Sequence, residues 1–120
     1  CKVLGSLELI DEGETDHKII CIVLTDPDVS RINSMADLDI VKPGTTDKLI
    51  DWLKRYKTSD GKPVNSLAQD TPTTVNEALA IIEETHDRWR NLCGHGAYAS
   101  SSYIKGAEKF WLTSAGCKGR

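Results

Sequence analysis

No apolar run in this 120-residue sequence approaches the roughly 20 residues that a membrane-spanning helix requires. The first residues also lack the basic and then apolar layout of a signal peptide. Basic residues are not in excess, because 15 Lys and Arg stand against 18 Asp and Glu and give a net charge of -3. These absences argue against a membrane partner and against nucleic acid, whose binders usually carry a basic face. An anionic ligand would need cations as intermediaries.

Cysteines at metal-binding or redox spacing are also missing. The four cysteines, Cys1, Cys21, Cys93 and Cys117, are widely separated and form no C-x-x-C pair. Two of them lie in apolar segments, a pattern typical of reduced thiols, so we expect a cytoplasmic protein. Cys93 and His95 lack the second pair of ligands that a structural zinc site needs.

The first part of the sequence predicts two strands joined by a tight turn. Val3, Leu7 and Leu9 alternate with other positions, which indicates a half-buried strand over residues 2–10 with a partly wet outer face. Residues 18–24 are almost continuously apolar and β-branched, as in a strand covered on both faces. The polar segment between them has the composition of a hairpin turn, so the strands should be antiparallel neighbours.

A loop and a short helix are predicted next. Residues 25–44 contain two proline turn signals and suggest a loop with one short helical turn. Apolar residues at helical spacing in residues 49–56 predict an amphipathic helix, with Thr45 or Thr46 as its N-cap.

A second helix is predicted after Pro72. Thr74 and Glu77 have the spacing of a capping box ahead of an apolar stripe over residues 75–92. Gly94 should end this helix. From there the composition shifts to Gly, Ala and Ser, so the remaining tail is expected to be disordered or to wrap another surface.

Acidic residues flank the predicted turn. Asp11 ends the first strand and Asp16 begins the second, so the hairpin folds the two carboxylates back towards each other. Lys18 leaves the same strand face as Asp16. Mg²⁺ prefers carboxylate oxygens and completes its shell with water and phosphate, while a lysine adds a positive charge for phosphate. Taken alone, this spacing is more typical of solvated loop residues than of a metal site.

Longer motifs accompany these residues. The string DEGETDHK at residues 11–18, with KVLG before it, resembles the active-site hairpin of family I soluble inorganic pyrophosphatases. Trp52 with RYK at residues 55–57, and DGKPVN at residues 60–65, are similar to segments of the eukaryotic-type members. THDRW at residues 85–89 resembles their last helix, so the resemblance covers Cys1 to about Leu92.

The resemblance implies an activity, a cofactor and five site residues. The activity is Mg²⁺-dependent hydrolysis of pyrophosphate to two phosphates, which makes the protein an inorganic diphosphatase. The site comprises two metal ligands, Asp11 and Asp16, and three phosphate-binding groups, Lys18, Tyr56 and Lys57. From spacing alone, Tyr56 would be an acceptable core residue of its helix. His86 and Asp87 point about 100° apart on a helix and are interpreted as structural.

The resemblance also implies a fold and partners. The fold class is α+β, an OB-like five-stranded β-barrel with flanking helices, to which this chain contributes about two long strands and two helices. The family's acidic motif D-x-D-P-x-D is not in the sequence. Residues 1–93 are therefore expected to be the C-terminal portion of a catalytic domain and residues 94–120 a tail. Its partners would be the missing N-terminal half and, in the intact enzyme, a second copy in a homodimer; the isolated fragment should be inactive.

Two other hypotheses remain open from the sequence. A non-catalytic remnant could pair with another chain through exposed strand edges and the apolar stripe of residues 75–92, and it would associate without turnover. An OB-like module that binds nucleic acid is disfavoured by the acidic balance and by the few aromatic residues on the strands.

Overall fold

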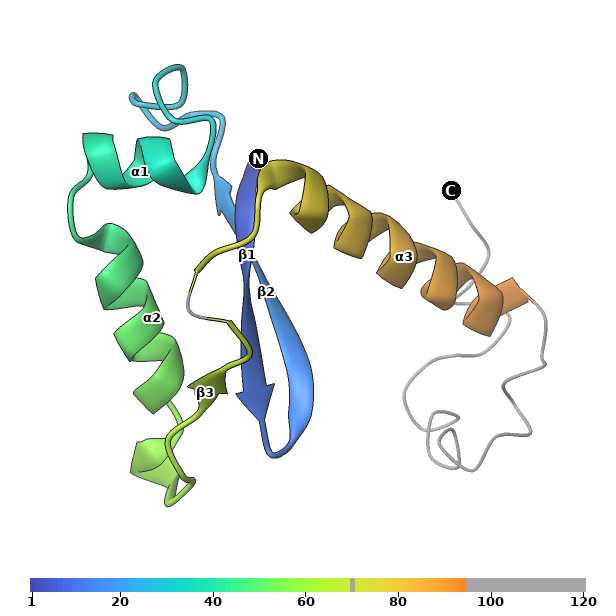
Figure 1. Ribbon diagram of the computed structural model, residues 1–120. Helices are drawn as coiled ribbons and strands as arrows, with labels where there is room; N and C mark the ends of the chain where they lie inside the picture. The colour runs from blue at the N-terminus through green and yellow to red at the C-terminus, as the bar shows by residue number, and fades with distance from the viewer. Residues whose placement is uncertain (70, 95–120) are drawn as a thin grey trace. The chain divides into compact units, whose positions relative to one another are not determined.

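The computed structural model describes residues 1–69 and 71–94, and it contains mixed α and β structure (Figure 1). The elements are β1 (Lys2–Asp11), β2 (Glu14–Ile22), α1 (Met35–Val41), α2 (Thr45–Arg55), the short 3-10 helix η1 (Thr58–Asp60), β3 (Ser66–Leu67) and α3 (Val75–Gly94). None of the helices in these ranges is long and apolar enough to cross a membrane. The predicted α+β content and the two long strands are confirmed.

The chain divides into two compact units, residues 1–80 and residues 81–120. The first unit contains the three described strands and the start of α3. In the second, the structure describes the remainder of α3, residues 81–94. The predicted tail, apart from Gly94, lies outside the described residues.

The predicted hairpin is confirmed. β1 and β2 are antiparallel, and their last pair is Asp11 with Glu14. The two residues between them, Glu12 and Gly13, have φ values of 52° and 88°. Positive φ at both central positions is typical of the primed turns that match the twist of a hairpin. The turn therefore sets the register that aligns the acidic residues on the two strands.

The prediction that residues 18–24 form a strand covered on both faces is wrong. The sheet order is β2-β1-β3, so β2 lies at an edge, and within β2 only Ile22 is buried. Val23 and Leu24 follow the strand with 58% and 66% of their surface exposed. The three-stranded sheet is open, and the five-stranded barrel is not seen in the described residues.

β1 is more buried than its alternation predicted. A register shift between Val3 and Gly5 interrupts the pleat, and Ser6, expected on a wet face, is fully buried. Its backbone N–H donates to Thr73 Oγ1 at 2.9 Å, and the two hydroxyl oxygens lie 2.7 Å apart. A Cβ on Gly5 would lie 2.4 Å from the Thr73 carbonyl oxygen. The segment before α3 therefore closes tightly over this part of β1.

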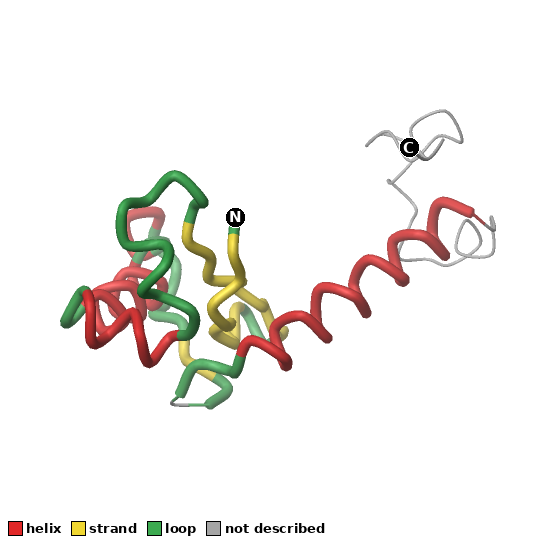
Figure 2. The backbone as a smooth tube through the Cα atoms, turned by 90° about the horizontal axis from the view of Figure 1, so that it is seen from above, coloured by secondary structure: helices red, strands yellow, loops and turns green. Residues whose placement is uncertain are grey.

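Two apolar clusters hold α1 and α2 beside the sheet (Figure 2). The first cluster contains Leu4, Ile22, Ile32, Met35 and Leu38. The second contains Leu7, Leu9 and Leu53, with Leu49, Ile50 and Leu67 packed against it. Leu53 thus anchors α2 on the face of β1 that carries Leu7 and Leu9. This packing fixes where the C-terminal end of α2 meets the hairpin.

Two helix starts differ from the predictions. α1 is a seven-residue helix, longer than the single turn expected, and Ser34 Oγ caps it by accepting the Asp37 N–H at 3.1 Å. The N-cap of α2 is Gly44, at φ 77°, instead of Thr45 or Thr46. The left-handed backbone at this position favours glycine, which has no Cβ.

The predicted capping box at the start of α3 is confirmed. The Thr74 N–H donates to Glu77 Oε2 at 2.7 Å, and the Glu77 N–H donates to Thr74 Oγ1 at 3.3 Å. Further along the stripe, Ala78 is fully buried while Leu79 remains 42% exposed. The helix ends at Gly94, as the sequence predicted.

The capping box should make the start of α3 sensitive to acid. The Thr74 backbone N–H, followed by its hydroxyl, lowers the pKa of Glu77 below its ordinary value. A lowered folded-state pKa adds stability above the ordinary value of about 4.3, and this stability is lost as pH falls through the folded pKa. We expect protection of the Thr74 amide from hydrogen exchange to fall in that range. In Glu77→Gln, which keeps a capping acceptor, protection of the Thr74 amide should not fall over the same pH range. Equal pH profiles in the two proteins would show that Glu77 does not cause the acid sensitivity.

Candidate functional site

One face of the hairpin carries the predicted metal ligands and the first predicted phosphate ligand. Leu9 pairs with Asp16 and Leu7 pairs with Lys18, and directly paired residues share a face. Asp11 lies two residues after Leu9 and continues that face. Asp11 and Asp16 are therefore diagonal neighbours near the turn, on the side of the sheet where α2 packs.

The end of α2 brings the other two predicted residues to this face. Because Leu53 is buried against Leu7 and Leu9, Tyr56 and Lys57 follow close to the hairpin. Lys57 Nζ forms an ion pair with Asp11 Oδ2 across 46 positions of sequence. Figure 1 shows the end of α2 and the segment after it beside the turn of β1 and β2.

Both predicted metal ligands are paired with predicted phosphate ligands. Lys18 Nζ lies 2.8 Å from Asp16 Oδ2, and both side chains are about one-third exposed, at 32% and 34%. In the other pair, Asp11 is the more buried partner, with 13% of its side chain exposed against 31% for Lys57. The hydrogen bond to Asp11 raises the pKa of Lys57, and Tyr56 acts in the same direction. The site therefore keeps Lys57 as a full positive charge.

Tyr56 lies beside Lys57 and outside the described apolar clusters. It is half-buried and is absent from the described clusters that contain Leu49, Ile50 and Leu53. Lys57 Nζ lies 5.6 Å from the centre of its ring, within the range of a cation–π contact. The Trp52 and Tyr56 rings are 5.3 Å apart between centroids. The interpretation of Tyr56 as a core residue is therefore not supported.

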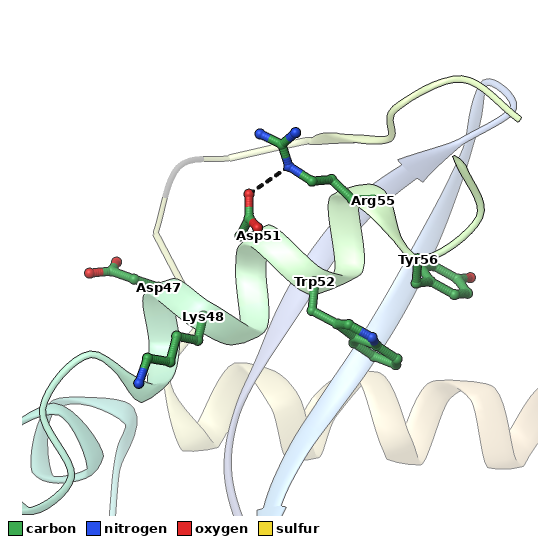
Figure 3. A pocket seen from close by; sticks show the side chains of 6 residues that line it. All are labelled: Asp47, Lys48, Asp51, Trp52, Arg55 and Tyr56. Atoms are coloured by element: carbon green, nitrogen blue, oxygen red, sulfur yellow. Dashed lines mark hydrogen bonds and ion pairs between the residues drawn. The ribbon is translucent and has the colours of Figure 1, made fainter. Parts of the chain in front are cut away.

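Trp52, noted in the sequence only as part of a motif, contacts Tyr56, and sequence reasoning assigned it no such role. Figure 3 shows it beside Tyr56 in a shallow surface pocket on α2, lined by Asp47, Lys48, Asp51, Trp52, Arg55 and Tyr56. Its side chain is 59% exposed, so burial does not explain its position. The i, i+4 spacing of the two aromatic residues was the available signal, because such residues are neighbours on a helix.

A second ion pair joins the hairpin turn to the segment after α2. Lys62 Nζ lies 2.5 Å from Glu12 Oε1, with 52% and 58% of these side chains exposed. The sequence leaves two interpretations for Lys62, in the DGKPVN segment: a surface lysine or a second-rank candidate for phosphate. It is a surface residue, but it forms a tie between the turn and this segment.

Asp26, in the loop after β2, and His86, interpreted from the sequence as structural, each have partners of their own. Asp26 accepts the Asp28 N–H at 2.8 Å and pairs with Lys42 at 3.2 Å, and the N–H contact followed by Lys42 lowers the pKa of Asp26. In the second unit, the His86 ring lies 5.5 Å from that of Trp89.

A divalent cation fits part of the hairpin site. Asp11 and Asp16 offer two carboxylate groups on one face. Within residues 1–69 and 71–94, no group of three or more His, Cys, Asp or Glu side chains is placed to hold a metal, so this pair would supply only part of a coordination shell. Mg²⁺ is often bound by one or two carboxylates, with water and phosphate oxygens in the other positions. The two aspartates are therefore suited to hold part of such a shell, beside lysines suited to phosphate.

These observations define a protein of mixed α and β structure that gathers carboxylates and lysines at one end of an open sheet. Its sequence matches the inorganic pyrophosphatase family over residues 1–90. An inorganic pyrophosphatase from Bos taurus is 49% identical over 92 residues, which cover 76% of this chain and 32% of that protein. The structure of inorganic pyrophosphatase from Schistosoma japonicum matches with a TM-score of 0.73 and 43% identity, over 76% of this chain and 32% of that chain.

An N-terminally truncated vacuolar soluble pyrophosphatase from Trypanosoma cruzi, solved in complex with PPi, is also similar. It matches with a TM-score of 0.72 and 34% identity, over 76% of this chain and 35% of that chain. The chain described here belongs to the inorganic pyrophosphatase family. It spans about a third of the length of these relatives. The resemblance seen in the sequence is confirmed.

Proposed function

We propose that this chain forms part of an enzyme that hydrolyses pyrophosphate to two phosphates with Mg²⁺. The observation that carries the proposal is the convergence of two carboxylates with Lys18, Tyr56 and Lys57 at one end of the sheet. Family membership supports the activity, and the PPi complex of the Trypanosoma cruzi relative supports the ligand.

The proposed role of each site residue follows from its charge. Asp11 and Asp16 would hold Mg²⁺, which supplies charge neutralisation and activation of water when bound. Lys18 and Lys57 would bind phosphate oxygens as point charges. The Tyr56 hydroxyl would donate a hydrogen bond to the phosphate, and charged or polar donors of this kind stabilise negative charge that develops on a leaving group. Trp52 would hold the Tyr56 ring in place.

The larger architecture is proposed on the same basis. Residues 1–93 would be the C-terminal portion of a catalytic domain with an OB-like five-stranded barrel, followed by a tail over residues 94–120. The exposed edge of β2 supports further strands from another part of that domain, since unpaired edges invite pairing. A homodimer and a cytoplasmic location remain proposals from the family resemblance and the cysteine pattern.

The alternative is an interaction module without catalysis, which the apolar residues Val23 and Leu24 at the end of β2 favour. The two hypotheses differ in what binds at the hairpin. A module that acts through strand edges has no requirement for ligand at Asp11 or Lys57.

Pyrophosphate titration with amide chemical shifts as the readout tests the proposal. With Mg²⁺ present, we expect pyrophosphate to shift the amides of residues 11–18 and 55–57. Residues of α1, which pack in the other apolar cluster, serve as the internal control. Shifts confined to α1 or to the β2 edge, or no shifts at all, would contradict the proposed site.

A further inference from the structure

In this structure, the side chains proposed to bind metal and those proposed to bind phosphate neutralise each other's charge. Lys57, proposed for phosphate, is paired with Asp11, proposed for metal, and Lys18 is paired in the same way with Asp16. An ammonium group and a divalent cation compete for the same carboxylate oxygens. Each ammonium group contacts Oδ2 of its aspartate, and a divalent cation bound to the same carboxylate would repel that ammonium group. Metal binding should therefore weaken both lysine–aspartate pairs, and phosphate binding to the lysines should weaken the same pairs.

The lysines have the freedom that such an exchange requires. About a third of each side chain is exposed, 31% for Lys57 and 32% for Lys18. Lysine carries its charge on a flexible four-carbon stem, so its ammonium can change partner without a change in the backbone. Lys57 also keeps contact with the Tyr56 ring, 5.6 Å from its centre, which would hold it near the site after it leaves Asp11.

We propose that Mg²⁺ binding at Asp11 and Asp16 releases Lys57 and Lys18 to the phosphate ligand, so that the two lysines couple metal binding to phosphate binding. The inference rests on the proposed function. Before ligands bind, the lysines act as internal counter-ions for the aspartates. Once the metal takes over that role, the same ammonium groups become available to the anion. By linkage, metal and phosphate must then strengthen each other's binding equally.

The neighbouring pair of Lys62 and Glu12 gives a matched control. It joins the same two segments and is also a lysine–carboxylate contact, at 2.5 Å. It includes neither proposed metal ligand. Loss of the Lys62 charge should therefore leave the coupling between metal and phosphate binding unchanged. Loss of the Lys57 charge should remove the contribution of one of the two lysines to that coupling.

The test measures Mg²⁺ binding to the 120-residue chain through the amide shifts of Asp11 and Asp16, first alone and then with inorganic phosphate. Without phosphate, Lys57→Gln should bind Mg²⁺ roughly two- to fivefold more tightly than the unsubstituted chain, the range expected for removal of one partly exposed ion pair. Lys62→Gln should match the unsubstituted chain. With Mg²⁺ saturating, phosphate should bind Lys57→Gln more weakly than either of the others. Lys57→Arg, which keeps a cation, should not gain Mg²⁺ affinity.

Tighter Mg²⁺ binding together with weaker phosphate binding in Lys57→Gln identifies the exchange, because a general loss of structure would weaken the binding of both ligands. If Mg²⁺ shifts Asp11 and Asp16 but Lys57→Gln binds it no more tightly than Lys62→Gln, the exchange is wrong while the proposed metal site stands. If Mg²⁺ leaves both aspartates unshifted in every variant, the metal assignment fails and the exchange fails with it.

Discussion

In the protein with its natural termini, Asp16→Asn is expected to weaken Mg²⁺ binding by at least about tenfold, and by up to about a hundredfold or more. Losses of that size follow the removal of groups that merely support a metal ligand, and Asp16 is proposed as a ligand itself. Asparagine keeps the size and one carbonyl oxygen of the side chain but removes its negative charge. The measurement is a Mg²⁺ titration by calorimetry.

Asp26→Asn provides the matched comparison. Asp26 is also an aspartate paired with a lysine, Lys42 at 3.2 Å, but it lies in the loop after β2. Its substitution should leave Mg²⁺ affinity within experimental error of the unsubstituted protein. Equal Mg²⁺ affinity in Asp16→Asn and Asp26→Asn would remove Asp16 from the metal site.

Leu9→Ala is expected to have the largest effect on stability, with a loss of about 2–5 kcal/mol in the free energy of unfolding. Leu9 is fully buried in a cluster with Leu7 and Leu53, and it pairs with Asp16 across the hairpin. Truncation leaves a cavity under the face that carries the site. Urea unfolding measures the loss, and the slope of the transition should be unchanged.

Ile40→Ala is the control for that measurement. Ile40 is apolar like Leu9, but 77% of its surface is exposed. Surface substitutions of this kind usually change stability by less than about 0.5 kcal/mol. If Leu9→Ala costs no more than Ile40→Ala, the packing of α2 on β1 does not stabilise the site.

The sequence predicted those elements that local chemistry determines. The hairpin follows from Glu12 and Gly13 between apolar strands, and the capping box follows from Thr74 and Glu77 three positions apart. β2 was misjudged because an apolar run does not reveal how many neighbours a strand has. Here β2 is an edge, so residues expected to be covered are exposed.

The site was predictable in part. The hairpin alone suggested that Asp11 and Asp16 approach each other and that Lys18 shares the face of Asp16, while the roles of Tyr56 and Lys57 came from motif resemblance. The pairing of Lys57 with Asp11 was beyond the sequence because it joins residues 46 positions apart. It depends on the burial of Leu53 against β1, a tertiary contact that no local pattern encodes.

Phosphate release from pyrophosphate, by the protein with its natural termini, tests the proposed function most directly. The assay compares excess Mg²⁺ with metal removed by a chelator, and uses a phosphomonoester as a second substrate. The account predicts release that requires Mg²⁺, that falls sharply in Asp16→Asn, and that strongly favours pyrophosphate over the monoester. Release of no phosphate from pyrophosphate, or release that persists without metal, would contradict it.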